Sequence, residues 1–200
     1  RCGYLALMSA VATGADWVLI PEEEMDARWH FKMVEALKRG RAAGRRHDVI
    51  IFAEGARHSD GLPIKADTII EILKQRMGVD ARVTVLGHVQ RGGSPTPFER
   101  NLASRMGAAA VEYLAGGDPT PVMIGLINNE TKTTPLDEVV AKSQAINAEI
   151  DSGNFEQALA LRGRSFADSL ELLRTLARAE PKQDVTGRGR IAVQHLPGGG

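Results

Sequence analysis

The apolar residues of this 200-residue chain fall into short runs that predict buried strands. A run of about four to eight apolar or β-branched residues that stops at a Gly, Pro or polar turn is typical of a strand. The run from Asp48 to Ala53 has almost no polar break, which favours a strand covered on both faces, as in a parallel sheet. Runs of the same kind lie at residues 16–21, 82–88 and 121–127.

Between these runs the apolar residues recur every three or four positions, which predicts amphipathic helices. The stretch from Glu23 to Ala43 shows this spacing at Met25, Trp29, Met33, Val34 and Leu37. Further helices are predicted at residues 3–13, 66–77, 97–115, 136–150 and 155–178. Strands that alternate with helices of this length predict an α/β fold, in which a largely parallel sheet carries helices on both faces in three layers.

The end of the chain predicts the start of a second unit. Residues 181–189 are polar with Pro and Gly and are typical of a linker. Residues 190–200 form a short apolar run that leads into three glycines, as at the first strand and phosphate-binding loop of many α/β units. We therefore expect one α/β portion at residues 1–180, a truncated second unit, and a chain that is a fragment of a longer protein. A flexible tail is the alternative for residues 190–200.

Composition and charge exclude several classes of function. The formal net charge is zero, so there is no basic surface of the kind that binds nucleic acid. No apolar run approaches the roughly 20 residues that span a bilayer. The single cysteine, Cys2, excludes an internal disulfide and a cysteine-type metal site, and it is typical of a reducing compartment such as the cytoplasm.

Candidate binding residues follow two of the predicted strands. Glu54 comes directly after the strand at 48–53, and His88 and Arg91 lie where the strand that begins at Arg82 gives way to a turn rich in Gly, Ser and Pro. The carboxyl ends of parallel strands meet at one edge of a sheet, where ligands bind. Arginine presents a fork of donors to phosphate, and a carboxylate accepts hydrogen bonds from sugar hydroxyls. The pattern predicts a sugar-phosphate site, with a purely structural role for each residue as the alternative.

Arg82 lies at the amino end of its predicted strand, about 20 Å from the carboxyl end at roughly 3.3 Å per residue. One small ligand can therefore hardly contact Arg82 and Arg91 of the same chain. We expect Arg82 to serve the site of a neighbouring subunit, which implies a homo-oligomer.

Other chemistries find little support in the sequence. There is no Gly-x-Ser-x-Gly elbow for a nucleophilic serine, and no pair of histidines at metal-ligand spacing. Arg45, Arg46 and His47 lie between a predicted helix and a predicted strand; they could meet an anionic effector, but a solvated basic turn is the interpretation we favour. Arg162 and Arg164 are interpreted as salt-bridging side chains on the last helix.

Three blocks of the sequence resemble the 6-phosphofructokinase family. Residues 2–22 resemble the segment that follows the Met-Gly-Arg substrate motif of that family, and Phe-Ala-Glu-Gly at 52–55 resembles its strand with a sugar-contacting glutamate. Residues 82–107, which begin Arg-Val-Thr-Val-Leu-Gly-His-Val-Gln-Arg-Gly-Gly-Ser-Pro, are the most specific match. Residues 154–166, the linker and the last strand resemble the amino-terminal half of the duplicated, eukaryotic-type enzyme.

The resemblance implies roles for individual residues. Glu54 would accept hydrogen bonds from fructose hydroxyls, His88 and Arg91 would contact the 6-phosphate and the sugar, and Arg82 would reach the 6-phosphate bound in an adjacent subunit. Asp16 and Arg45 align with positions that hold an allosteric nucleotide in bacterial members. Ala43 stands where those members have a lysine, which is a departure from the effector-site pattern.

The resemblance also implies a reaction: phosphorylation of fructose 6-phosphate to fructose 1,6-bisphosphate by ATP, in glycolysis. The ATP-binding glycine loop, the Mg²⁺-binding aspartate and the catalytic base of the family align upstream of Arg1. We therefore expect this chain to supply the substrate site without catalytic or metal-binding residues of its own, and to be inactive alone. Two alternatives remain: a pyrophosphate-dependent phosphofructokinase, and a non-catalytic regulatory unit that binds sugar phosphate.

Overall fold

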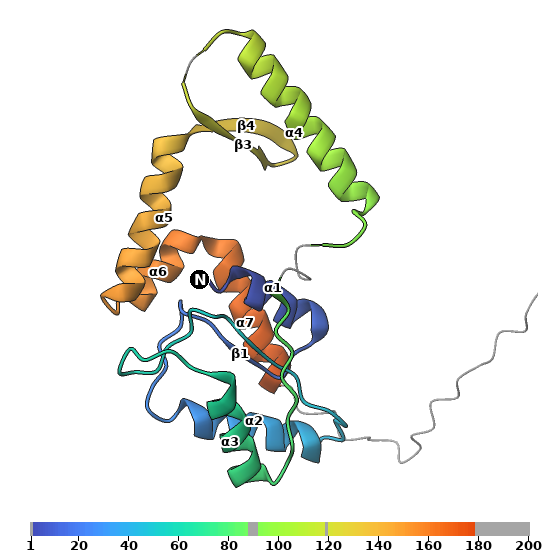
Figure 1. Cartoon of the computed structure of the whole chain (residues 1–200), viewed down its shortest axis with the longest axis vertical. Coiled ribbons are helices and arrows are strands. Elements are labelled where there is room, and N and C mark those ends of the chain that lie inside the picture. The colour runs from blue at the N-terminus through green and yellow to red at the C-terminus, as the bar shows by residue number, and fades with distance from the viewer. Residues whose placement is uncertain (1, 88–91, 119, 179–200) are drawn as a thin grey trace, which may run out of the picture.

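The computed structural model describes residues 2–87, 92–118 and 120–178 (Figure 1). Its elements alternate between helix and strand over the first part of the chain, as expected for an α/β fold. They run in the order α1 (Tyr4–Thr13), β1 (Trp17–Leu19), α2 (Trp29–Ala42), β2 (Ile50–Phe52), α3 (Ala66–Met77), α4 (Pro97–Ala115), β3 (Val122–Ile127), β4 (Glu130–Pro135), α5 (Leu136–Asp151), α6 (Phe155–Arg162) and α7 (Arg164–Arg178). Among these described residues, no helix combines the length and the apolar character needed to cross a membrane.

Strands β1 and β2 form a parallel pair at the centre of a three-layer arrangement. Trp17 pairs with Ile50 and Leu19 pairs with Phe52, so that both strands point the same way. Alternate residues along a strand face opposite sides of a sheet. Here Leu19 packs into a core with α2 and α3, while Val18 packs into a second core with α1 and α7. The predicted parallel strands with helices on both faces are thus present in this part of the chain.

The predicted strand at 121–127 is β3, but it does not join the parallel sheet. It pairs antiparallel with β4, a strand that we did not predict, with Met123 opposite Thr134 and Ile127 opposite Glu130. The connection consists of Asn128 and Asn129, whose φ angles are 51° and 65°. A two-residue turn with positive φ at both positions joins antiparallel strands and cannot join parallel ones. The two asparagines therefore fix the hairpin.

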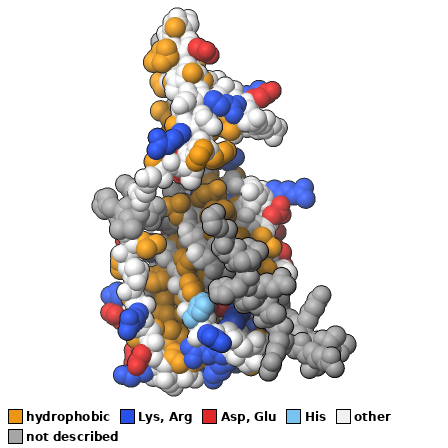
Figure 2. Space-filling view, turned by 90° about the vertical axis from the view of Figure 1, so that its right-hand side faces the viewer, with side chains coloured by type: hydrophobic (Ala, Val, Ile, Leu, Met, Phe, Trp, Pro, Cys, Tyr) orange, Lys and Arg blue, Asp and Glu red, His pale blue; other side chains and the backbone are white. Residues whose placement is uncertain are grey.

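The hairpin belongs to a part of the molecule that we call the hairpin arm: α4, β3, β4 and α5. In Figure 1, the hairpin leads into α5, which runs down to α6, and α4 lies beside the hairpin. No residue of α4 is buried within the described part of the chain. Figure 2 accordingly shows hydrophobic side chains on the surface of the arm, and Phe98, Val111 and Leu114 are among the exposed ones.

Three further expectations are corrected. The strand predicted from Arg82 is not formed, since residues 79–86 have neither helix nor strand pairing. Val85 is 86% exposed, so the apolar run lacks both the neighbouring backbone and the cover that a buried strand requires. The helix predicted from Glu23 begins only at Trp29. The single helix predicted at 155–178 is two helices, because Gly163 adopts a φ of 90° and ends α6. The predicted linker and the last strand lie outside the described residues.

Candidate functional site

Glu54 lies in a tight turn at the carboxyl end of the parallel pair. The backbone N–H of Ala53 donates to the carbonyl oxygen of Leu19 over 2.9 Å, which extends the strand pairing by one residue beyond β2. The N–H of Ala56 then donates to the carbonyl oxygen of Ala53, also over 2.9 Å, and closes the turn. Ala53 and Ala56 are buried, whereas Glu54 between them is exposed. The turn therefore presents a carboxylate to solvent from two buried anchor points.

A compact loop follows this turn and returns the chain to α3. The N–H of Ile64 donates to the carbonyl oxygen of Ala56 over 3.0 Å, and the N–H of His58 donates to that of Leu62 over 2.8 Å. Ile64 is 4% exposed and belongs to the core between the sheet and α2 and α3. In addition to these backbone bonds, the indole Nε1–H of Trp29 at the start of α2 donates to Nδ1 of His58 over 3.2 Å.

The other residues of the predicted sugar-phosphate site follow α3. Arg82 is exposed and lies in the segment without secondary structure. His88 and Arg91 lie outside the described residues. The expected cluster of Glu54, His88 and Arg91 and the distance from Arg82 to Arg91 therefore stay predictions. Gly92 and Gly93, which come next, have open space where a Cβ atom would stand.

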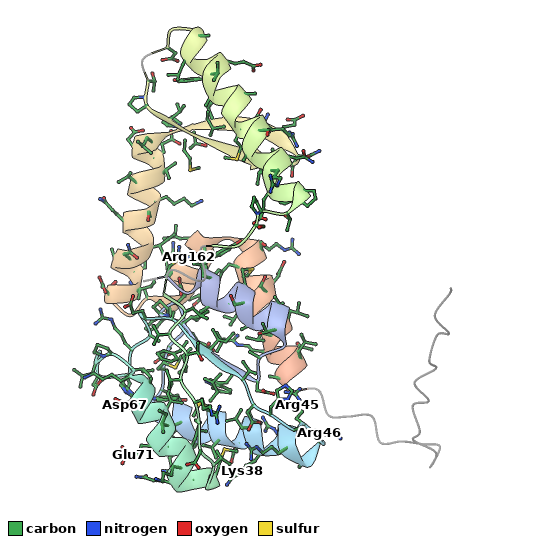
Figure 3. The ribbon with its side chains drawn as sticks, turned by 45° about the vertical axis from the view of Figure 1, so that its right-hand side comes forward. Lys38, Arg45, Arg46, Asp67, Glu71 and Arg162 are labelled. Atoms are coloured by element: carbon green, nitrogen blue, oxygen red, sulfur yellow. The ribbon has the colours of Figure 1, made fainter. Side chains whose placement is uncertain are left out.

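Asp16 and Arg45, the two candidate effector residues, bind each other. The guanidinium Nη1 of Arg45 donates to Oδ1 of Asp16, whose side chain is 6% exposed. The other carboxylate oxygen of Asp16 accepts the backbone N–H of Val49 over 2.8 Å, and Nη2 of Arg45 donates to the carbonyl oxygen of Leu176 over 3.4 Å. The pair thus joins the start of β1, the start of β2 and the end of α7. Figure 3 shows Arg45 near the end of α7. A role in effector binding stays a prediction.

Sequence reasoning missed a buried carboxylate at the same edge of the sheet. Glu22 follows β1 as Glu54 follows β2, but its side chain is 0% exposed. Both of its oxygens accept the backbone N–H of Gly3, over 3.0 and 2.9 Å, and Arg162 binds it over 2.7 Å through Nη2. The strand-end rule that selected Glu54 applies equally to Glu22 and could have found it. The interpretation of Arg162 as a salt-bridging residue is confirmed.

Burial and neighbouring charges change the pKa of His30, the residue after Trp29. His30 packs against Trp29 and Phe31, and burial lowers the pKa of its imidazole below the ordinary value; Arg76 and His58 nearby act in the same direction, and Asp26 acts against them. Arg76 itself stacks on the ring of Phe31, with its guanidinium carbon 4.0 Å from the ring centroid. Within the described ranges, no three His, Cys, Asp or Glu side chains are grouped so that they could hold a metal ion.

Parallel βα units that present a polar side chain at the carboxyl edge of the sheet are typical of α/β proteins that bind small ligands at that edge. The family model of the phosphofructokinases, described as "Phosphofructokinase", matches residues 1–114, and the chain belongs to this family. The resemblance and the fold class expected from the sequence are thereby confirmed.

Relatives and solved structures agree with this assignment. The human muscle-type ATP-dependent 6-phosphofructokinase is 42% identical over 198 residues, which cover 98% of this chain and 25% of the human protein. The liver-type enzyme of Pongo abelii is 42% identical over 92% of the chain and 24% of its own length. The T-state crystal structure of Pichia pastoris phosphofructokinase matches 88% of the chain and 19% of its own, with a TM-score of 0.82 and 37% identity. The Saccharomyces cerevisiae enzyme matches with a TM-score of 0.82 and 33% identity. The chain spans about a quarter of the length of the curated relatives it matches.

Proposed function

We propose that this chain is the sugar-phosphate-binding portion of an ATP-dependent 6-phosphofructokinase that transfers the γ-phosphoryl group of ATP to the 1-hydroxyl of fructose 6-phosphate. The similarity to ATP-dependent 6-phosphofructokinases over 98% of the chain is the observation that carries the proposal. It favours ATP over pyrophosphate as the phosphoryl donor. The cytoplasmic location and the place in glycolysis expected from the sequence belong to the same proposal.

In this proposal Glu54 binds sugar hydroxyls, and His88 and Arg91 bind the sugar and its 6-phosphate. The exposed position of Glu54 at the carboxyl edge of the parallel pair supports its role, because a carboxylate exposed there is accessible to the hydroxyls of a ligand. Arg82 reaches the 6-phosphate in a neighbouring subunit of a homo-oligomer, and its exposure leaves the guanidinium accessible for that contact. ATP would supply the phosphoryl group and Mg²⁺ would neutralise its charge, both bound mainly by residues upstream of this chain.

Asp16 and Arg45 are kept as proposed effector residues. Arg45 is partly exposed, with 37% of its side chain accessible, so an anion could approach the guanidinium from the solvent side. Such binding would compete with the bond to Asp16, and it would thereby change how tightly the end of α7 is held to the sheet.

The test uses the full-length protein that contains this chain. Glu54→Gln removes the charge and keeps the shape, and we expect the KM for fructose 6-phosphate to rise about ten- to a hundredfold while the KM for ATP stays nearly constant. Glu71→Gln, on the exposed surface of α3, is the matched control and should change neither value. An unchanged KM in the Glu54 variant would contradict the assigned role. Turnover with pyrophosphate but not ATP would identify the other donor, and binding of fructose 6-phosphate without turnover would identify a regulatory unit.

A further inference from the structure

We infer that Arg45 is a latch on α7: its guanidinium caps the last turn of that helix and so fixes the point from which the chain continues into residues 179–200. The sequence predicts a linker and the start of a second unit in those residues. The inference goes beyond the proposed function, because the latch requires neither a substrate nor an effector.

The side chain of Arg45 reaches both the sheet and α7 from the turn between α2 and β2. Nη1 donates to Oδ1 of Asp16, and Nη2 donates to the carbonyl oxygen of Leu176 over 3.4 Å, at the end of α7 where Figure 3 places Arg45. Asp16 is itself fixed, since its side chain is 6% exposed and its other oxygen accepts the N–H of Val49 over 2.8 Å. The guanidinium is therefore held on the sheet side and extends its second arm to the helix.

A glycine in α2 provides the space for this path. A Cβ atom on Gly40 would stand 3.1 Å from Cδ of Arg45, and 3.7 and 3.8 Å from its Nε and Nη1. Gly40 is buried, and its carbonyl oxygen accepts the backbone N–H of Arg45 over 3.0 Å. Glycine destabilises the interior of a helix. At this position it allows the side chain of Arg45 to pass directly over α2 towards Asp16.

The last turn of α7 depends on Arg45 more than the rest of the helix does. Leu170 and Leu173 are 2% and 3% exposed and anchor α7 in the core, whereas Leu176 beyond them is 45% exposed. The last four carbonyl groups of a helix have no partner within it, and the helix dipole favours a cation beside them. Arg45 supplies such a cation and donor from 131 residues earlier in the chain.

Loss of this cap would free the last turn and leave the body of α7 in place. At 3.4 Å the bond to Leu176 is long and its acceptor is uncharged, so it gives way before the ion pair with Asp16 does. Arg174 binds Glu23 over 2.6 Å and holds the preceding turn, so the opening should stop there. The sheet and the chain beyond residue 178 would then be joined less rigidly.

The experiment measures amide hydrogen exchange by mass spectrometry in the full-length protein. Arg45→Lys keeps a cation for Asp16 but replaces the two-armed fork with a single ammonium group. Arg46→Lys, at the next exposed position, is the matched control. We expect exchange in residues 174–178 to rise about three- to tenfold in Arg45→Lys, because a partly exposed bond from a charged donor is lost. Exchange in residues 164–170, and in all of α7 in Arg46→Lys, should match the wild type.

Two further measurements make the test decisive. Trypsin cleavage after Arg178 should accelerate by a similar factor in Arg45→Lys, because cleavage requires an opened helix end. Gly40→Ala should also raise exchange in residues 174–178, although alanine favours α2 itself, and it decides the question if Arg45→Lys does not fold. Equal exchange of residues 174–178 in Arg45→Lys and the wild type would overturn the inference. A rise spread evenly over α7 would overturn it too, since it would indicate general destabilisation. Neither result depends on the role proposed for Glu54, which the KM of Glu54→Gln tests separately.

Discussion

Arg162, the last residue of α6, binds Glu22, which follows β1 and stands 140 residues earlier in the chain. Nε and Nη2 of the guanidinium approach Oε1 of the carboxylate to 3.0 and 2.7 Å. The same carboxylate accepts the backbone N–H of Gly3, the residue before α1. One buried side chain therefore joins three segments: the start of α1, the end of β1 and the end of α6.

Removal of Arg162 should destabilise the fold strongly. Arg162→Ala leaves the charge of Glu22 buried without its cation, and loss of one partner of a buried ion pair costs about 3–5 kcal/mol. We expect a fall of about 3 kcal/mol in the free energy of unfolding, because the side chain of Arg162 is itself 18% exposed. Arg164→Ala is the matched control, two residues further on, since its 3.6 Å pair with Asp168 is exposed on both sides. Equal losses for the two variants in urea titrations would contradict this account.

Two glycine substitutions should change stability in opposite directions. A Cβ atom on Gly3 would stand 2.4 Å from Oε2 of Glu22 and 2.5 Å from Cβ of Ile20, both buried. Gly3→Ala should therefore lower the free energy of unfolding by about 1–3 kcal/mol, as overpacking does. Gly107, inside α4, has nothing within 4 Å of such an atom. Gly107→Ala should raise stability by up to about 1 kcal/mol, since alanine favours the helix. Thermal unfolding of the two variants in parallel measures both signs.

Local signals in the sequence were sufficient to predict the helices whose ends are marked by capping residues. The prediction of α4 from Pro97 is confirmed, and the structure shows why it begins there. Oγ1 of Thr96 accepts the N–H of Glu99 over 3.3 Å, while the carboxylate of Glu99 accepts the N–H of Thr96 over 2.6 Å. The backbone N–H of Thr96 and its hydroxyl, which donates to the same carboxylate over 2.9 Å, lower the pKa of the Glu99 carboxyl. A reciprocal cap of this kind, with Pro at the first helical position, depends on a few adjacent residues and can be read without tertiary information.

The antiparallel partner of β3 and the pairing of Glu22 with Arg162 could not be predicted in this way. The apolar run at 82–87 has the composition of a strand, but a strand exists only where another backbone supplies its hydrogen bonds. The partner of β3 turned out to be polar β4, joined to it by Asn128 and Asn129, and the local apolar pattern gave no sign of it. The Glu22–Arg162 pair joins residues 140 positions apart, so no window of sequence contains both.

Acid should lower the stability of the fold partly through His30. Burial, Arg76 and His58 lower the pKa of its imidazole in the folded state from the ordinary 6.5. The unfolded chain therefore takes up the proton first as the pH falls through about 6.5, and the free energy of unfolding decreases until the lowered folded-state pKa is passed. His30→Gln should make the loss of stability between pH 7 and pH 5 smaller. His47→Gln, at an exposed site, should leave the pH profile of urea unfolding as it is; an unchanged profile in His30→Gln would refute the assignment.

The last prediction concerns Arg82 and assembly. If Arg82 serves the site of a neighbouring subunit, Arg82→Ala and Arg91→Ala should each weaken binding of fructose 6-phosphate about ten- to a hundredfold in the full-length protein. Mixing the two variants should restore some sites, because a subunit with intact Arg91 can receive intact Arg82 from the other chain.

Mixing Arg91→Ala with His88→Ala is the matched control for that experiment. Both residues are proposed to serve the site of their own subunit, so every site in such a mixture keeps one defect and activity should not exceed the sum of the two variants. Subunit exchange is verified independently with differently tagged chains. If the Arg82 and Arg91 mixture behaves like this control after exchange, the shared site is wrong. The exposed Arg82 then needs another role, and the argument that the site requires a neighbouring subunit no longer holds.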